Sequence, residues 1–168
     1  MKSNGLSAAS AALLLLAACA SQEPAPVKDR GIDVDEVVRE PAEQEGTGLQ
    51  VYPLQNEGVQ DLSGQARQAE QAGEYERAAS ILQRALRLKP KDPELLQHMA
   101  EVQLQQKNYE QALNFASRSY DIGPRVGELC SRNWRTISVA REKLNDPTGA
   151  REAELRSDAC AREKPESF

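Results

Sequence analysis

Histidine and aromatic side chains are scarce in this sequence. The 168 residues include one histidine, His98, and aromatic residues make up 4% of the chain. No serine or cysteine is placed to act with His98, no glycine-rich loop could cradle a phosphate, and no zinc-binding spacing is present. We therefore expect a protein that is not an enzyme and that holds no cofactor and no metal ion, with His98 at the surface or in a groove.

An excess of positive charge is also missing. The formal net charge is −5 at pH 7, and residues 61–168 hold 17 basic and 17 acidic side chains. Domains that bind nucleic acid ordinarily carry a basic patch or stripe, so we expect no nucleic-acid partner. The negative charge lies in residues 20–60, where nine acidic and three basic residues give a net charge of −6.

Long apolar runs are absent except near the N-terminus. The run Ala8–Ala18 follows Lys2 and has the length of a signal-peptide core, which is too short to span a bilayer. It ends in Leu16-Ala17-Ala18-Cys19, which resembles the lipobox of bacterial lipoproteins.

The lipobox resemblance implies a signal peptide of residues 1–18 and cleavage before Cys19. Lipid would then be attached to the sulfur and the new amino group of Cys19, and several acyl chains give a lasting anchor. The familiar inner-membrane retention signal would place aspartate after the cysteine, whereas this chain has Ala20. We expect an outer-membrane anchor with the protein facing the periplasm.

Residues 19–60 are predicted to be a disordered tether. They are rich in proline, glycine and acidic residues, a composition that buries too little apolar surface to fold alone. Two pieces differ: Ile32–Val38 alternates apolar and acidic residues, and Leu49–Leu54 is apolar enough to dock. The second piece has two interpretations, a strap packed on the first helix of the domain or a contact arm for a partner.

The rest of the chain is organised by a 34-residue pattern. The following positions recur 34 residues later: Leu62, Ala66, Tyr75, Ala78 and Pro90 as Leu96, Ala100, Tyr109, Ala112 and Pro124. A period of this length with a central turn and a closing proline is typical of helical repeats, and the pattern resembles the tetratricopeptide repeat family. It predicts an all-α domain over residues 61–168. Six helices in three antiparallel pairs are expected near 60–72, 75–89, 93–106, 109–122, 125–145 and 148–163, with no sheet.

The third helix pair departs from the repeat. Its turn, near residue 146, comes about eight residues later than the period predicts, so this unit is either a lengthened repeat or a capping hairpin. Cys130 and Cys160 lie at similar distances from that turn, on inward stripes of antiparallel helices. We expect a disulfide between them in an exported protein; the alternative is two buried free thiols. Trp134 is expected in the core.

A groove is expected on the face built by the first helix of each pair. Its side chains are mostly polar with mixed charge, which suits a protein segment better than an apolar ligand; the alternative is that they are merely solvated. The candidate groove residues are Ser63, Arg67, Glu70, Gln71, Gln97, Glu101, Leu104, Gln105, Ser131, Arg135 and Ser138. Arg67, Glu101 and Arg135 are the expected charged contacts, with Arg67 and Glu101 exposed.

The layout of lipobox, acidic proline-containing tether and one small repeat domain resembles the LpoP-type lipoprotein activators of peptidoglycan synthases. That resemblance implies an outer-membrane lipoprotein that stimulates a periplasmic class A penicillin-binding protein, acting as a monomer. A second interpretation is a pilotin or assembly factor for an envelope machine. A cell-wall enzyme is disfavoured because catalytic groups are missing from the sequence.

Overall fold

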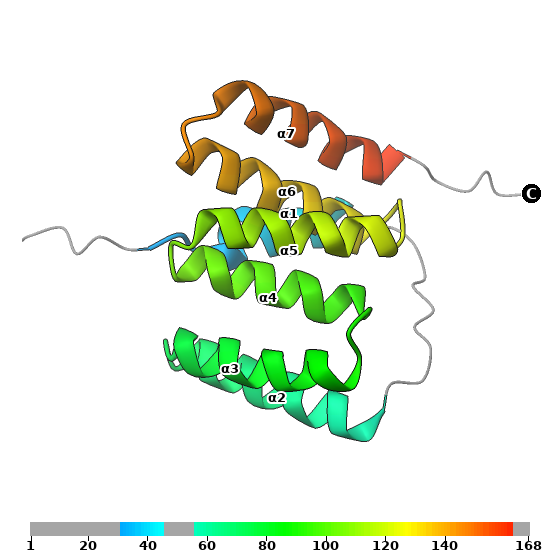
Figure 1. Cartoon of the computed structure of the whole chain (residues 1–168). Coiled ribbons are helices and arrows are strands. Elements are labelled where there is room, and N and C mark those ends of the chain that lie inside the picture. The colour runs from blue at the N-terminus through cyan, green and yellow to red at the C-terminus, as the bar shows by residue number, and fades with distance from the viewer. Residues whose placement is uncertain (1–30, 46–55, 163–168) are drawn as a thin grey trace, which may run out of the picture.

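The computed structural model describes residues 31–45 and 56–162, and this part of the chain is helical, without a strand (Figure 1). Within it, a short π-helical turn, η1, precedes seven α-helices. The bounds are η1 Asp35–Arg39, α1 Glu40–Glu45, α2 Glu57–Gln71, α3 Tyr75–Leu88, α4 Pro93–Gln105, α5 Tyr109–Ile122, α6 Glu128–Lys143 and α7 Pro147–Arg162. The predicted all-α class is confirmed. The predicted number of six helices is wrong, because α1 was not expected.

Helices α2 to α7 form the antiparallel pairs that the repeat predicts. The pairs α2–α3, α4–α5 and α6–α7 stack in chain order, with α3 against α4 and α5 against α6 (Figure 1). The first of these helices begins at Glu57, four residues before the expected domain boundary at residue 61. Each pair buries its apolar stripe against the next, so the three pairs form a single array.

The turns and caps follow from particular residues. Gly73 and Lys107, 34 positions apart, occupy the left-handed region with φ of 75° and 62°, so the first two pairs turn in the same way. The side chain of Asp92 accepts a hydrogen bond from the Leu95 amide at 3.1 Å, and Pro93 lies in the first turn of α4, where no amide donor is needed.

The core divides into clusters along the stack. Around α2, α3 and the start of α4, Leu82 and Met99 are fully buried among small side chains such as Ala66 and Ala78. Alanines at these positions let the helices approach closely, so a larger side chain there would force them apart. The second cluster is centred on Trp134, which is 9% exposed. The prediction that Trp134 belongs to the core is confirmed.

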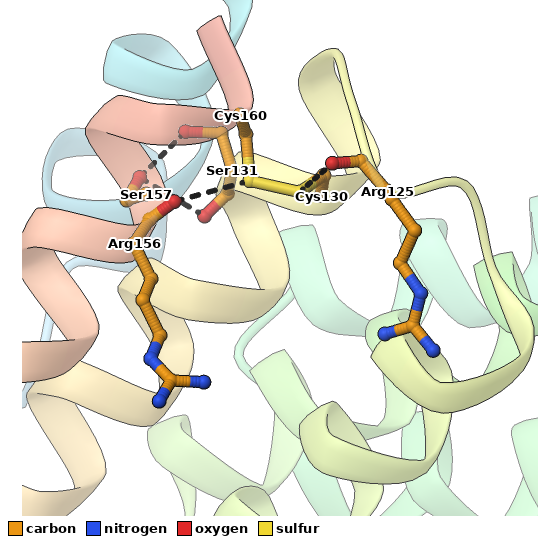
Figure 2. Close-up of a disulfide and its surroundings, with 6 residues drawn as sticks. All are labelled: Arg125, Cys130, Ser131, Arg156, Ser157 and Cys160. Carbon is orange, nitrogen blue, oxygen red and sulfur yellow. Dashed lines mark hydrogen bonds between the residues drawn. A yellow bond between two sulfur atoms is a disulfide. The ribbon is translucent and has the colours of Figure 1, made fainter.

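The last pair is closed by the disulfide between Cys130 and Cys160, as predicted (Figure 2). Their Cα atoms lie 5.7 Å apart, and the bond links residues separated by 30 positions. Close by, the hydroxyl groups of Ser131 and Ser157 are hydrogen-bonded at 2.7 Å, and the Gly127 amide donates to the Cys160 carbonyl at 3.1 Å. These bonds join the start of α6 to the end of α7.

The unexpected helix lies in the region predicted to be disordered, and that prediction is wrong for residues 35–45. Val34, Val38 and Ala42 are fully buried, and they lie four residues apart, on one helical face. Pro41 has no amide hydrogen to donate. Directly before it, the Glu40 amide donates to the Asp35 carbonyl five residues back, which is the hydrogen bond of a π-helix. The alternation noted at Ile32–Val38 hid this four-residue period.

Several predictions concern residues outside the described part of the chain. These are the signal peptide of residues 1–18, the lipid site Cys19 and the apolar piece Leu49–Leu54. Among the described helices, none is long and apolar enough to cross a membrane.

Candidate functional site

The candidate site is the groove lined by α2, α4 and α6, the first helices of the three pairs. The segment η1–α1 lies along it and contacts α6; in Figure 1 this blue segment is seen behind α5. The segment runs opposite to α4. Ile32 lies near Tyr109, which follows the end of α4, whereas Glu43 shares a cavity with Glu94 at the start of α4.

The structure separates the predicted groove residues by exposure. Ser63, Glu70, Gln97, Glu101, Leu104 and Ser131 are buried, Gln105, Arg135 and Ser138 are half-buried, and Arg67 and Gln71 are exposed. Ser131 and Ser138 face α7: they bond to Ser157 and to the Ala150 carbonyl. The predicted list therefore mixes groove positions with positions that hold the array together.

The prediction that Glu101 is exposed is wrong, because its side chain is fully buried. Its carboxylate accepts hydrogen bonds from the Nε and Nη2 atoms of Arg132, each at 2.9 Å. On the other side, Arg39 of η1 donates its Nε–H to Glu101 at 2.9 Å. The unexpected segment thus covers Glu101 and supplies one of its two cationic partners.

The same arginine joins a second carboxylate. Arg39 Nη2 lies 2.8 Å from Glu70 Oε1, and the other oxygen of Glu70 lies 2.9 Å from His98 Nε2. His98 is largely buried and lines the groove, which is the second of the two places expected for it. Glu70, His98, Arg39, Glu101 and Arg132 form one network, called here the ion-pair cluster.

Electrostatics fix the charges in the ion-pair cluster. Burial alone would raise the pKa of Glu101, but the guanidinium groups of Arg132 and Arg39 outweigh it and lower the pKa to about 2. Burial also opposes ionisation of Glu70, yet the His98 hydrogen bond and the Arg39 charge leave its pKa lowered. These carboxylates stay ionised at neutral pH, which suits a structural role and not proton transfer.

A buried polar layer continues from the ion-pair cluster between α4 and α6. The side-chain amide of Gln97 donates to Glu101 Oε1 at 2.9 Å and to Thr136 Oγ1 at 2.8 Å. These bonds orient the carboxylate between Arg39 and Arg132 and fix the spacing of α4 and α6. Gln97 was predicted to contact a partner. In the structure it is buried and links α4 to α6 beneath the groove surface.

Part of the groove is open. A cavity of about 380 Å³ lies beside η1 and α1, at the N-terminal parts of α4 and α6. Its walls are formed by Arg39, Glu43, Ser63, Arg67, Glu94, Leu95, His98, Glu128 and Arg132. Charges of both signs and a single leucine make this lining suited to polar groups of a protein segment, and poorly suited to an apolar small molecule.

Sequence reasoning missed Arg39 and Arg132 as site residues. Arg132 is one position away from the predicted Ser131, so its omission was an error in phasing α6 against the groove. For Arg39 a signal existed: an arginine directly follows Val38 in the apolar series Val34, Val38 and Ala42. Such a series predicts a short amphipathic helix with the guanidinium beside its apolar face.

Comparison with known proteins agrees with this architecture. The tetratricopeptide repeat model matches residues 64–119. The globular C-terminal domain of P. aeruginosa LpoP is 31% identical and superposes with a TM-score of 0.58, over 62% of this chain and 98% of that one.

PcrH, solved in complex with the chaperone-binding region of PopB, is 21% identical with a TM-score of 0.60, over 68% of this chain and 90% of that one. At this identity the similarity to PcrH shows the fold alone. No curated protein matches the chain in sequence. The 31% identity to LpoP extends over nearly all of that domain, and this chain therefore belongs to the tetratricopeptide-repeat family of the LpoP globular domain.

Proposed function

We propose that this chain is an outer-membrane lipoprotein whose repeat domain binds a periplasmic class A penicillin-binding protein and activates its synthesis of glycan strands. The observation that supports the proposal most is the 31% identity to the LpoP globular domain over 98% of that domain. The order of signal, cysteine, acidic tether and repeat domain in the sequence supports it independently.

Activation needs no catalytic group on this chain. A bound protein shifts an enzyme toward its active state by binding that state more tightly than the inactive one. A rigid docking domain serves this purpose, because it loses little conformational freedom on binding. The disulfide and the ion-pair cluster supply such rigidity around the groove.

The proposed contact surface is the open part of the groove. Arg67 is exposed there and takes part in none of the ion pairs among the described residues, so its charge is available to a partner. Glu94 and Glu128 on the opposite wall, each 3.5 Å from Arg132, add negative charge to the groove. A partner segment with both an acidic and a basic side chain would match these walls.

Anchoring is part of the same proposal. Lipid on Cys19 would hold the chain at the outer membrane, and the residues between Cys19 and α1 would let the domain reach its partner. Cys19→Ser is expected to release the protein from the membrane fraction and to abolish its effect in cells, while leaving stimulation by the purified protein unchanged.

The decisive experiment is glycan polymerisation by a purified class A penicillin-binding protein of the same organism, with and without residues 20–168 of this chain. A dose-dependent rise in the polymerisation rate is expected. No stimulation over a wide concentration range, with the disulfide formed, would refute the activator proposal.

The second candidate is an assembly factor that holds a segment of another envelope protein. One observation favours it: the groove already accommodates a helical segment, η1–α1, as a binding domain of that kind would. An assembly factor would form a stable complex with its client and leave glycan polymerisation unchanged, so the same assay separates the two functions.

A further inference from the structure

The segment of residues 34–45 occupies the groove as a bound peptide would. Its buried side chains, Val34, Val38 and Ala42, point to one side, and the first two share a cluster with Leu104 of α4 and Ala140 of α6. Between them, Asp35, Glu36 and Val37 are exposed. The segment therefore contributes one apolar face and no core of its own.

A helix this short depends on its surroundings. Helices shorter than about 12–15 residues are marginal in water, and η1 and α1 together span Asp35–Glu45. Pro41 weakens it further, since it removes one backbone donor. The segment is helical because the groove holds it, and the equilibrium between its bound and released forms is set by its contacts with the groove.

The charged contact gives this site its selectivity. Arg39 spans α2 and α4 by pairing with Glu70 at 2.8 Å and Glu101 at 2.9 Å. Both carboxylates are largely buried, and Glu101 has Arg132 as a further partner. An occupant that brought apolar side chains and no cation would remove one cationic partner from each carboxylate, leaving Glu70 with His98 and Glu101 with Arg132 and Gln97.

We infer that this half of the groove is a binding site for an amphipathic helix that bears an arginine, and that residues 34–45 are its occupant within the chain. The pattern it recognises is an aliphatic or small residue at positions i, i+4 and i+8 with arginine at i+5, as in Val34, Val38, Ala42 and Arg39. A segment of this pattern in another protein competes with residues 34–45 for the site.

Connection to the same chain explains why the site is filled. A tethered ligand has an effective concentration in the millimolar range, so a free helix of equal intrinsic affinity is excluded until the tethered segment is weakened. The inference rests on the groove contacts and does not depend on which protein the domain activates.

The test uses residues 20–168 and a fluorescently labelled synthetic peptide of residues 31–45 as the probe. In Val38→Asp the carboxylate is placed against Leu104 and Ala140, which releases the tethered segment. The matched control is Val37→Asp, because Val37 is the neighbouring exposed residue. Fluorescence anisotropy is expected to show peptide binding by Val38→Asp at least tenfold tighter than by the wild type or by Val37→Asp.

A peptide in which Arg39 is replaced by glutamate is expected to bind Val38→Asp at least tenfold more weakly than the native peptide. If circular dichroism shows that Val38→Asp does not fold, Arg39→Gln replaces it, since that change keeps the apolar contacts. Equal binding of the native peptide to wild type and variant, or no binding by a folded variant, would overturn the inference. A failure of stimulation in the polymerisation assay would not affect this result.

Discussion

The two halves of the groove differ in what occupies them. The half formed by the C-terminal parts of α4 and α6 is covered by residues 34–45, and Arg39 of this segment pairs with the buried carboxylates of Glu70 and Glu101. The half formed by the N-terminal parts of α4 and α6 is an open cavity, with Arg67 of α2 exposed beside it. The buried carboxylates hold a segment of the same chain, whereas the exposed side chain of Arg67 in the open half is the candidate for contact with the synthase.

The largest loss of unfolding free energy is expected from a substitution in the half that residues 34–45 cover. Glu101→Gln removes the buried carboxylate from between Arg39 and Arg132, leaving two half-buried guanidinium groups without their shared partner. Breaking a buried ion pair from one side costs about 3–5 kcal/mol of unfolding free energy. Chemical denaturation measures this loss.

The control is Glu94→Gln in the open half, where the carboxylate is partly exposed and lies 3.5 Å from Arg132. There the expected cost is below about 1 kcal/mol. Equal losses of unfolding free energy in the two variants would show that the carboxylate of Glu101 stabilises the fold no more than the carboxylate of Glu94 does.

Removal of the disulfide is expected to cause the next largest loss of unfolding free energy. Cys160→Ser opens the link between residues separated by 30 positions, which corresponds to about 3–4 kcal/mol of unfolding free energy in the chain-entropy model. Thermal melting measures it, and wild type in a reducing agent should lose the same amount. A variant that melts like the oxidised wild type would show that packing of α6 on α7 suffices without the bond.

Acid should weaken the filled half selectively. The pKa of Glu101 is lowered to about 2, so its ionised form stabilises the fold above the usual carboxyl pKa. That stability, about 3 kcal/mol, is lost as the pH falls from about 4.5 through 2. The difference in unfolding free energy between wild type and Glu101→Gln should therefore shrink over this range. A difference that stays constant down to pH 2 would contradict the ionised state of Glu101.

The smallest effect on stability is expected in the open half. Arg67→Glu changes an exposed side chain, so the free energy of unfolding should move by less than about 0.5 kcal/mol. Stimulation of the synthase should nevertheless fall, because the reversed charge faces the partner. The matched control is Arg84→Glu, the same change at an exposed position of α3. Equal stimulation by the two variants would remove Arg67 from the contact surface.

Local patterns predicted the repeat helices well. The pairing of α2 to α7, the turns at Gly73 and Lys107 and the partnership of Cys130 with Cys160 follow from periodicity and from distances along helices. Such features depend on residues near one another in sequence or on one facing helix pair, which a pattern captures.

For the occupant of the groove, the local period of Val34, Val38 and Ala42 was weaker than the signal of composition. Residues 35–45 are acidic and contain a proline, so their composition favours disorder, and their helix exists only through contacts with distant residues such as Leu104 and Ala140. A disordered tether would leave Glu101 uncovered on the side where Arg39 lies, so the prediction of a tether carries with it the prediction of an exposed Glu101. The error about Glu101 therefore follows from the error about the segment.

The most direct test of the account is to locate the partner on the domain. Hydrogen–deuterium exchange of residues 20–168 would be measured with and without the purified class A penicillin-binding protein. The account predicts slower exchange at the N-terminal parts of α4 and α6 and around Arg67 on α2, with α3 and α5 unchanged. Protection confined to α3, α5 and α7 would contradict it, because the partner would then bind the face opposite the groove.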